Sequence, residues 1–91
     1  MHRRSVEICV GDLTSARAAA EGGADRVELC ADLPSGGVTP SFGLVAEVVD
    51  RVGIAAHVLI RSRAGDFVAG PDELAVMLRD IDAARSGRAH V

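Results

Sequence analysis

Six polar side chains that could do chemistry stand at alternate positions of three short aliphatic segments. They are Glu7, Cys9, Glu28, Cys30, His57 and Arg61. Thiolates are soft ligands that suit Cu(I), and imidazole can complete such a site. Carboxylates can exchange protons with a substrate, and guanidinium groups bind carboxylate or phosphate. These residue types therefore indicate either a metal site or an enzyme that acts on a small anion.

The alternation places all six groups on one side of a sheet. Side chains of a strand point to opposite faces in turn, so the aliphatic residues of the same segments take the other face. That aliphatic face must pack against helices. A doubly wound sheet has helices on both faces, whereas a barrel wall has helices on one face only. We therefore expect the polar set to project into the interior or the mouth of a barrel.

A short repeat links the first two of these segments. The residues V-E-I-C at 6–9 recur as V-E-L-C at 27–30, 21 positions later. The repeat predicts that Cys9 and Cys30 lie at equivalent heights on consecutive strands, which are ~4.8 Å apart when paired. The hypothesis is a Cu(I) site formed by both thiols, with His57 as a possible third ligand.

The second hypothesis is a barrel enzyme that acts on a small anionic substrate. Arg61 and Arg63 would clamp a carboxylate or phosphate. The glycine-containing loop at 32–41 leads to a helix N-terminus, which could also hold an anion. The candidates for general acid and base are Glu7, Glu28 and His57. Burial beside another carboxylate would raise the pKa of either glutamate.

The order of elements predicts parallel strands joined by crossover helices. We expect strands at about 5–10, 25–31 and 54–60, and helices at about 12–21, 40–52 and 71–85. Asp12 is the predicted N-cap of the first helix, and Thr39 precedes Pro40 as that of the second. The segment 89–91 resembles the start of a fourth strand. This alternation is typical of βα units.

Helical spacing of aliphatic residues predicts the buried stripes of the second and third helices. The second stripe consists of Leu44, Val45, Val48, Val49 and Val52. The third consists of Leu74, Met77, Leu78 and Ile81.

The composition is that of an ordinary globular protein. The 91 residues are 48% hydrophobic and carry a net charge of −3, and every basic residue is an arginine. This balance gives no case for binding nucleic acid or an anionic membrane. Two cysteines are too few for a disulfide scaffold. With no apparent leader or membrane span, we expect a soluble cytoplasmic protein.

The motifs together resemble the CutC copper-homeostasis family. They are E-I-C-V (7–10), G-G-A-D-R-V-E-L-C (22–30), G-G-V-T-P-S-F-G (36–43), H-V-L-I-R (57–61), R-A-G-D-F (63–67) and M-L-R-D-I (77–81). The resemblance implies a TIM-type (β/α)8 barrel, copper handling, a cytoplasmic location and assembly into homo-oligomers. Two positions depart from the family pattern: Ser62 replaces a usual proline, and Ala69 replaces a frequent aromatic residue.

The length limits what this chain can do alone. A (β/α)8 barrel needs about 250 residues, so we expect only the N-terminal three to three and a half βα units, an incomplete barrel. Such a wedge leaves strand edges unpaired, which favours marginal stability, oligomers or aggregation. An enzyme site would be inactive in this form. The third hypothesis is a non-catalytic chain, either without activity or using its open edge for interaction.

Overall fold

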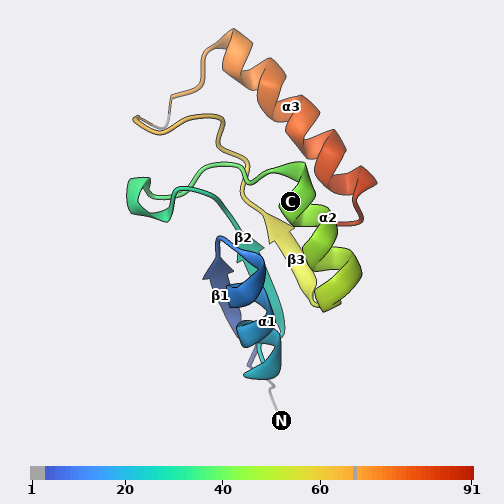
Figure 1. The fold of residues 1–91 in the computed structure, drawn as a ribbon. Helices are drawn as coiled ribbons and strands as arrows, with labels where there is room; N and C mark the ends of the chain where they lie inside the picture. Colours follow the sequence, from blue (N-terminus) through green and yellow to red (C-terminus); the bar gives the residue numbers. More distant parts are fainter. Residues whose placement is uncertain (1–3, 67) are drawn as a thin grey trace.

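Three parallel strands form the centre of the molecule, as the sequence predicts (Figure 1). The computed structural model describes residues 4–66 and 68–91. The strands are β1 (Glu7–Val10), β2 (Arg26–Leu29) and β3 (Ala55–Val58), in the spatial order β1-β2-β3. β2 ends earlier than predicted because Ala31 leaves the sheet and pairs with Val38 of the following loop.

The helices alternate with the strands. They are α1 (Leu13–Glu21), α2 (Phe42–Glu47), which continues as a π-helical turn (Val48–Val52), and α3 (Pro71–Ser86). Asp12 caps α1 as predicted, since its Oδ1 accepts the N–H of Ser15 at 2.6 Å. The prediction of Thr39 as the cap of α2 is wrong. The cap is Ser41, whose Oγ accepts the N–H of Leu44 at 3.1 Å, because Thr39 is engaged elsewhere.

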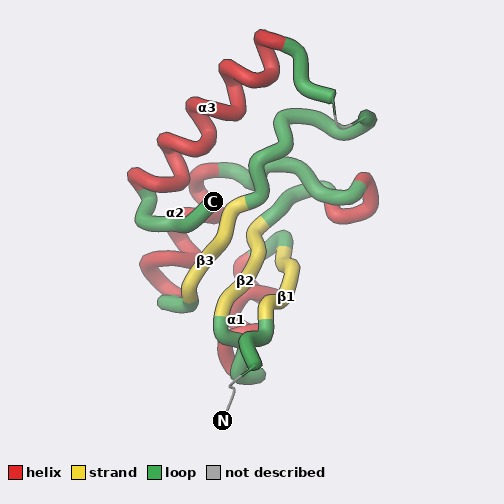
Figure 2. The backbone as a smooth tube through the Cα atoms, turned by 180° about the vertical axis from the view of Figure 1, so that it is seen from behind, coloured by secondary structure: helices red, strands yellow, loops and turns green. Residues whose placement is uncertain are grey.

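The strand register places aliphatic side chains in rows on one face of the sheet. One row is Ile8, Val27 and Ala56, and the next is Val10, Leu29 and Val58. α1 and α2 cover this face. Figure 2, seen from behind, shows the strands in front of these two helices, with the opposite face of the sheet uncovered. This arrangement of one covered and one open face is the one expected from the alternation.

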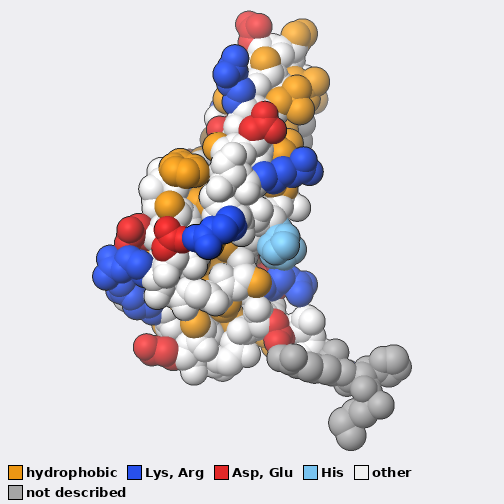
Figure 3. All heavy atoms as spheres, turned by 90° about the vertical axis from the view of Figure 1, so that its right-hand side faces the viewer, with side chains coloured by type: hydrophobic (Ala, Val, Ile, Leu, Met, Phe, Trp, Pro, Cys, Tyr) orange, Lys and Arg blue, Asp and Glu red, His pale blue; other side chains and the backbone are white. Residues whose placement is uncertain are grey.

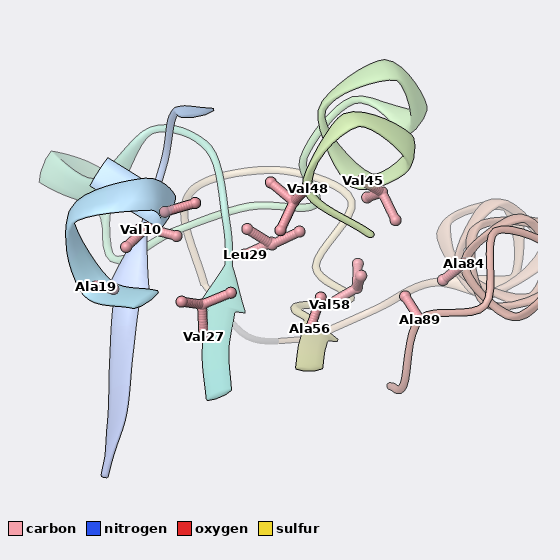
Figure 4. Close-up of a cluster of buried hydrophobic side chains, with 11 residues drawn as sticks. Val10, Ala19, Val27, Leu29, Val45, Val48, Ala56, Val58, Ala84 and Ala89 are labelled. Carbon is pink, nitrogen blue, oxygen red and sulfur yellow. The ribbon is translucent and has the colours of Figure 1, made fainter. Parts of the chain in front are cut away.

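The core lies between the sheet and the first two helices (Figure 4). Val27 and Leu29 of β2 and Val48 beyond α2 are fully buried. Removing such a side chain from water stabilises the fold by about 1.5–3 kcal/mol. Of the stripe predicted for the second helix, Val45 and Val48 are buried, and the others are half-buried at the core's margin.

The predicted buried stripe of α3 is largely exposed. Leu74 and Leu78 are 51% and 58% accessible, and Met77 and Ile81 are half-buried. Figure 1 shows α3 leaning away from the sheet, and Figure 3 shows hydrophobic side chains on the surface at that end of the molecule. The reason is that the helix packs mainly on α2 near its own C-terminal end, where Ala84 is buried. No helix within the described residues is long and apolar enough to cross a bilayer.

Candidate functional site

A row of polar side chains crosses the uncovered face of the sheet. The register pairs Cys9 with Glu28 and Glu28 with His57, and a parallel bridge places His90 beside His57. The rings of the two histidines have centroids 5.0 Å apart. The shared face of the first three residues confirms the alternation argument. His90 was not a predicted site residue, because the segment around it is too short to show alternation.

Cys9 and Glu28 form the closest contact of the row. The Cys9 Sγ donates to Glu28 Oε1 at 3.8 Å. Loss of solvent raises the pKa of the Cys9 thiol above its ordinary value, and the negative charge of Glu28 raises this pKa further. The thiol is therefore protonated at neutral pH, and a cation that replaces its proton would also be attracted by the neighbouring carboxylate.

Glu7, one step along the same face of β1, is engaged by an arginine. Arg26 Nε donates to Glu7 Oε2 at 2.7 Å across the β1–β2 pair. Sequence reasoning overlooked Arg26, although it has the same strand parity as Glu28 and so belongs to the same face. The ion pair gives Glu7 a structural partner on the open face.

The prediction of equal heights for Cys9 and Cys30 is wrong. Cys9 is the register partner of Glu28, so Cys30 lies two residues farther along the chain than the residue opposite Cys9. A spacing of ~4.8 Å between strands and ~3.3 Å per residue then puts the two Cα atoms about 8 Å apart. Pairing Val10 with Leu29 sets this register, and a shift of two residues leaves the face unchanged.

This diagonal separation bears on what the thiols can do together. Both cysteines are free, and about 8 Å between Cα atoms exceeds the 4.4–6.8 Å of ordinary disulfides. A bridging metal ion adds two metal–sulfur bonds, each ~2.3 Å for zinc, to the span. The geometry therefore suits a shared metal ion better than a direct disulfide.

Cys30 is buried under a loop rather than in the core. Its side chain is 1% accessible, yet it does not belong to the cluster of aliphatic side chains beneath the helices. Its Sγ lies 3.8 Å from the carbonyl oxygen of Val10. Desolvation raises the pKa of the Cys30 thiol, and the charges of Cys9 and Glu28 raise it further.

The structure does not support His57 as a third ligand beside both cysteines. β2 stands between β1 and β3, so His57 is two strand spacings, ~10 Å, from Cys9. Over residues 4–66 and 68–91, no group of three or more His, Cys, Asp or Glu side chains could hold one metal ion. A site that includes both thiols therefore has no third protein ligand among the described residues.

Arg61 binds backbone carbonyl groups of two loops. Its Nη1 donates to the oxygens of Gly37 at 2.8 Å and Ser35 at 3.1 Å, and its Nη2 donates to Gly65 O at 2.8 Å. Its backbone N–H donates to Thr39 Oγ1 at 2.8 Å. The guanidinium predicted to clamp an anion thus holds the loop after β2 against the loop after β3.

Arg63 is balanced by two carboxylates. Its Nε donates to Glu73 at 2.7 Å and its Nη2 to Asp66 at 3.1 Å. The hydrogen bond to Glu73 is the largest cause of the raised pKa of Arg63, followed by the hydrogen bond to Asp66. The hydrogen bond from Arg63 in turn lowers the pKa of Asp66. Arg61 and Arg63 both line a pocket of about 180 Å³ beyond the end of β3. Phe67, the last residue of the motif at 63–67, lies outside the described residues.

Comparison with known proteins places the chain among CutC family sequences. The family model described as the CutC family matches residues 4–90. The chain is 56% identical over 81 residues to a CutC family protein of Agrobacterium fabrum, covering 89% of this chain and 32% of that protein. It is 46% identical over 86 residues to a CutC family protein of Bacteroides thetaiotaomicron, covering 93% of this chain and 34% of that protein. The chain spans about a third of the length of these curated relatives.

The fold also matches a solved structure. A crystal structure of CutC from Streptococcus agalactiae, described as a copper homeostasis protein, superposes with a TM-score of 0.86 and 36% sequence identity. The match covers 96% of this chain and 43% of that chain. The three parallel βα units therefore correspond to less than half of a larger α/β fold.

Proposed function

Because this chain belongs to the CutC family, we propose that it acts in copper homeostasis and that Cys9 and Cys30 together bind Cu(I). The name of the Streptococcus agalactiae protein supports the general role. Since the chain spans about a third of its curated relatives, the activity of the whole protein, its barrel closure and its cytoplasmic location belong to this proposal. The cytosol would keep both thiols reduced and able to bind a soft metal.

The placement of the two thiols is the observation that carries the Cu(I) site. Cys9 lies in β1, and Cys30 directly follows the end of the neighbouring strand β2 with the same parity, diagonal to Cys9. Cu(I) accepts soft sulfur ligands, and two-coordinate binding needs no third side chain. Both thiols have raised pKa values, so binding releases protons and strengthens as the pH rises.

A competitive Cu(I) titration without oxygen tests this site. The purified chain and a chromogenic Cu(I) chelator compete for the metal, and the Cys9→Ser, Cys30→Ser double variant is compared with wild type. We expect one Cu(I) per chain and a loss of affinity of at least 100-fold in the double variant. The matched control is His90→Gln, which changes a polar side chain of the same face and should bind normally. Unchanged affinity in a folded double variant would refute the site.

A pocket at the end of β3 supports a second candidate function. Barrel enzymes place their sites at the carboxyl ends of the strands, and Arg61 and Arg63 line the pocket there. The candidate is an enzyme that acts on a small carboxylate or phosphate, with Glu7, Glu28 or His57 as acid and base. Inorganic phosphate should then raise the melting temperature of wild type but not of Arg63→Gln. Stabilisation by Cu(I) alone would favour the thiol site.

A further inference from the structure

The loop after β2 folds back across the end of its own strand. We call residues 31–39 the strap. Ala31 and Val38 exchange two backbone hydrogen bonds, of 2.9 Å from Ala31 N to Val38 O and 2.8 Å in return. The strap then runs on to β3, where Thr39 N donates to Arg61 O at 2.9 Å. The strap therefore lies beyond the carboxyl ends of β2 and β3, next to Cys30 (Figure 1).

Gly37 is the part of the strap that lies on Cys30. A Cβ built at Gly37 would come within 2.9 Å of Leu59 Cδ2 and 3.4 Å of Cys30 Cβ, and 3.8 Å from the sulfur. The φ of Gly37 is +93°, a conformation that side-chain-bearing residues rarely adopt. The backbone of the strap therefore passes close to Cys30, a residue that is 1% accessible, and leaves no room there for a side chain at position 37.

Arg61 holds the strap in this position. It donates to the carbonyl oxygens of Ser35 and Gly37 within the strap, and to Gly65 of the next loop. The planar guanidinium reaches carbonyls in three directions at once, which a lysine ammonium on a flexible stem cannot reproduce. All three contacts are made within the chain itself.

We propose that Arg61 is a positioning residue that latches the strap over Cys30, so that this thiol meets solvent and exchanges Cu(I) only when the latch opens. The link to copper exchange rests on the proposed function. The latch itself consists of hydrogen bonds within the chain. Cys9 lies outside the strap and is exposed, so the two thiols should differ in access although they share a face.

Thiol labelling of the apo chain tests the latch without copper. In a Cys9→Ser background, Cys30 is the single thiol, and its reaction with Ellman's reagent is followed by absorbance. We expect Arg61→Gln to increase the rate at least 10-fold, Gly37→Ala to do the same by steric strain, and Arg61→Lys to fall between wild type and Arg61→Gln. Arg51→Gln, whose contact with Glu47 lies outside both loops, should leave the rate unchanged.

A core variant separates local opening from general destabilisation. Val48→Ala weakens the fold beneath the helices, far from the strap contacts, and its melting temperature gives the reference for an equal loss of stability. The latch is refuted if Arg61→Gln leaves the Cys30 rate unchanged, or if Val48→Ala raises it as much at the same loss of melting temperature.

Copper transfer then tests the functional meaning of the latch. We expect Cu(I) to pass from Arg61→Gln to a chelator at least 10-fold faster than from wild type, with Arg51→Gln unchanged. Equal transfer rates would refute the role in exchange. If the wild-type chain binds no Cu(I), the proposed function fails, while the labelling rates still decide whether Arg61 latches the strap.

Discussion

Cys9 and Glu28 are the residues on which the chemistry of the open face depends most closely. The carboxylate accepts a hydrogen bond from the thiol and raises its pKa. It thus opposes the free thiolate but favours a cation bound to the sulfur, because opposite charges attract. A thiol held in this way reacts more slowly than a free thiol at neutral pH, because less of it is thiolate.

Removing the charge of Glu28 should make Cys9 more acidic. In a Cys30→Ser background, Cys9 is the single thiol, and the pH dependence of its alkylation by iodoacetamide reports its pKa. We expect Glu28→Gln to lower this pKa and to speed alkylation several-fold at pH 7, since the thiolate is the nucleophile. Desolvation, which the substitution leaves in place, should keep the pKa from falling to that of a free thiol.

Glu7→Gln is the matched control for this charge. Glu7 also raises the pKa of Cys9 but is the smallest contribution, and Arg26 pairs with it. Glu7→Gln should therefore shift the pKa of Cys9, measured by alkylation, less than Glu28→Gln does. An unchanged or higher pKa in Glu28→Gln would show that the carboxylate does not face the thiol.

The sequence predicts the face of these residues but not their register. Alternation depends only on strand parity, so Cys9, Glu28 and His57 could be assigned to one side without coordinates. The alignment between parallel strands depends on which aliphatic pairs are buried under α1 and α2, and a shift of two residues preserves parity. The 21-residue repeat therefore suggested a pairing of Cys9 with Cys30 that the fold does not adopt. The contacts of Arg61 with backbone oxygens have no sequence signal.

At the scale of elements, α3 forms as its sequence pattern predicts, but its apolar stripe is not buried as predicted. The heptad-like spacing correctly predicts a helix, since spacing and Pro71 are local features. The stripe is buried only where another element packs against it, and the spacing of residues within α3 does not predict such an element. In the described residues, α3 meets mainly α2 near its C-terminal end.

Two substitutions measure how far α3 is exposed. Leu78 is 58% accessible, so Leu78→Ala should change the free energy of unfolding by less than about 0.5 kcal/mol. Val48 is fully buried, so Val48→Ala should cost about 2 kcal/mol through lost burial and a cavity. Urea unfolding followed by circular dichroism gives both values. A loss for Leu78→Ala equal to that of Val48→Ala would show that α3 is covered in solution.

At the scale of the whole molecule, a strand edge and one face of the sheet are exposed. β1 is an outer strand of the sheet, and Val6 and Ile8 beside its edge are 49% and 40% accessible. One face of the sheet lacks a covering helix in the part of the chain that the structure describes (Figure 2). Unpaired edges and apolar surface favour association, and self-association of this chain stays a prediction.

Size-exclusion chromatography with thermal circular dichroism tests this expectation. We predict oligomers or a broad, low-temperature transition for the isolated chain. Ile8→Lys should increase the monomer fraction, because a charge beside an edge strand opposes pairing with another copy. Ser5→Lys, which adds the same charge at an already polar position, is the control. A sharply melting monomer would contradict the prediction.

The central claim is that one Cu(I) ion binds between Cys9 and Cys30. X-ray absorption at the copper edge identifies the atoms bound to the metal in the Cu(I)-loaded chain. We expect two sulfur atoms and no imidazole nitrogen bound to copper, and loss of the two-sulfur coordination in either Cys9→Ser or Cys30→Ser. A shell of nitrogen or oxygen alone, or a spectrum that neither substitution changes, would contradict it.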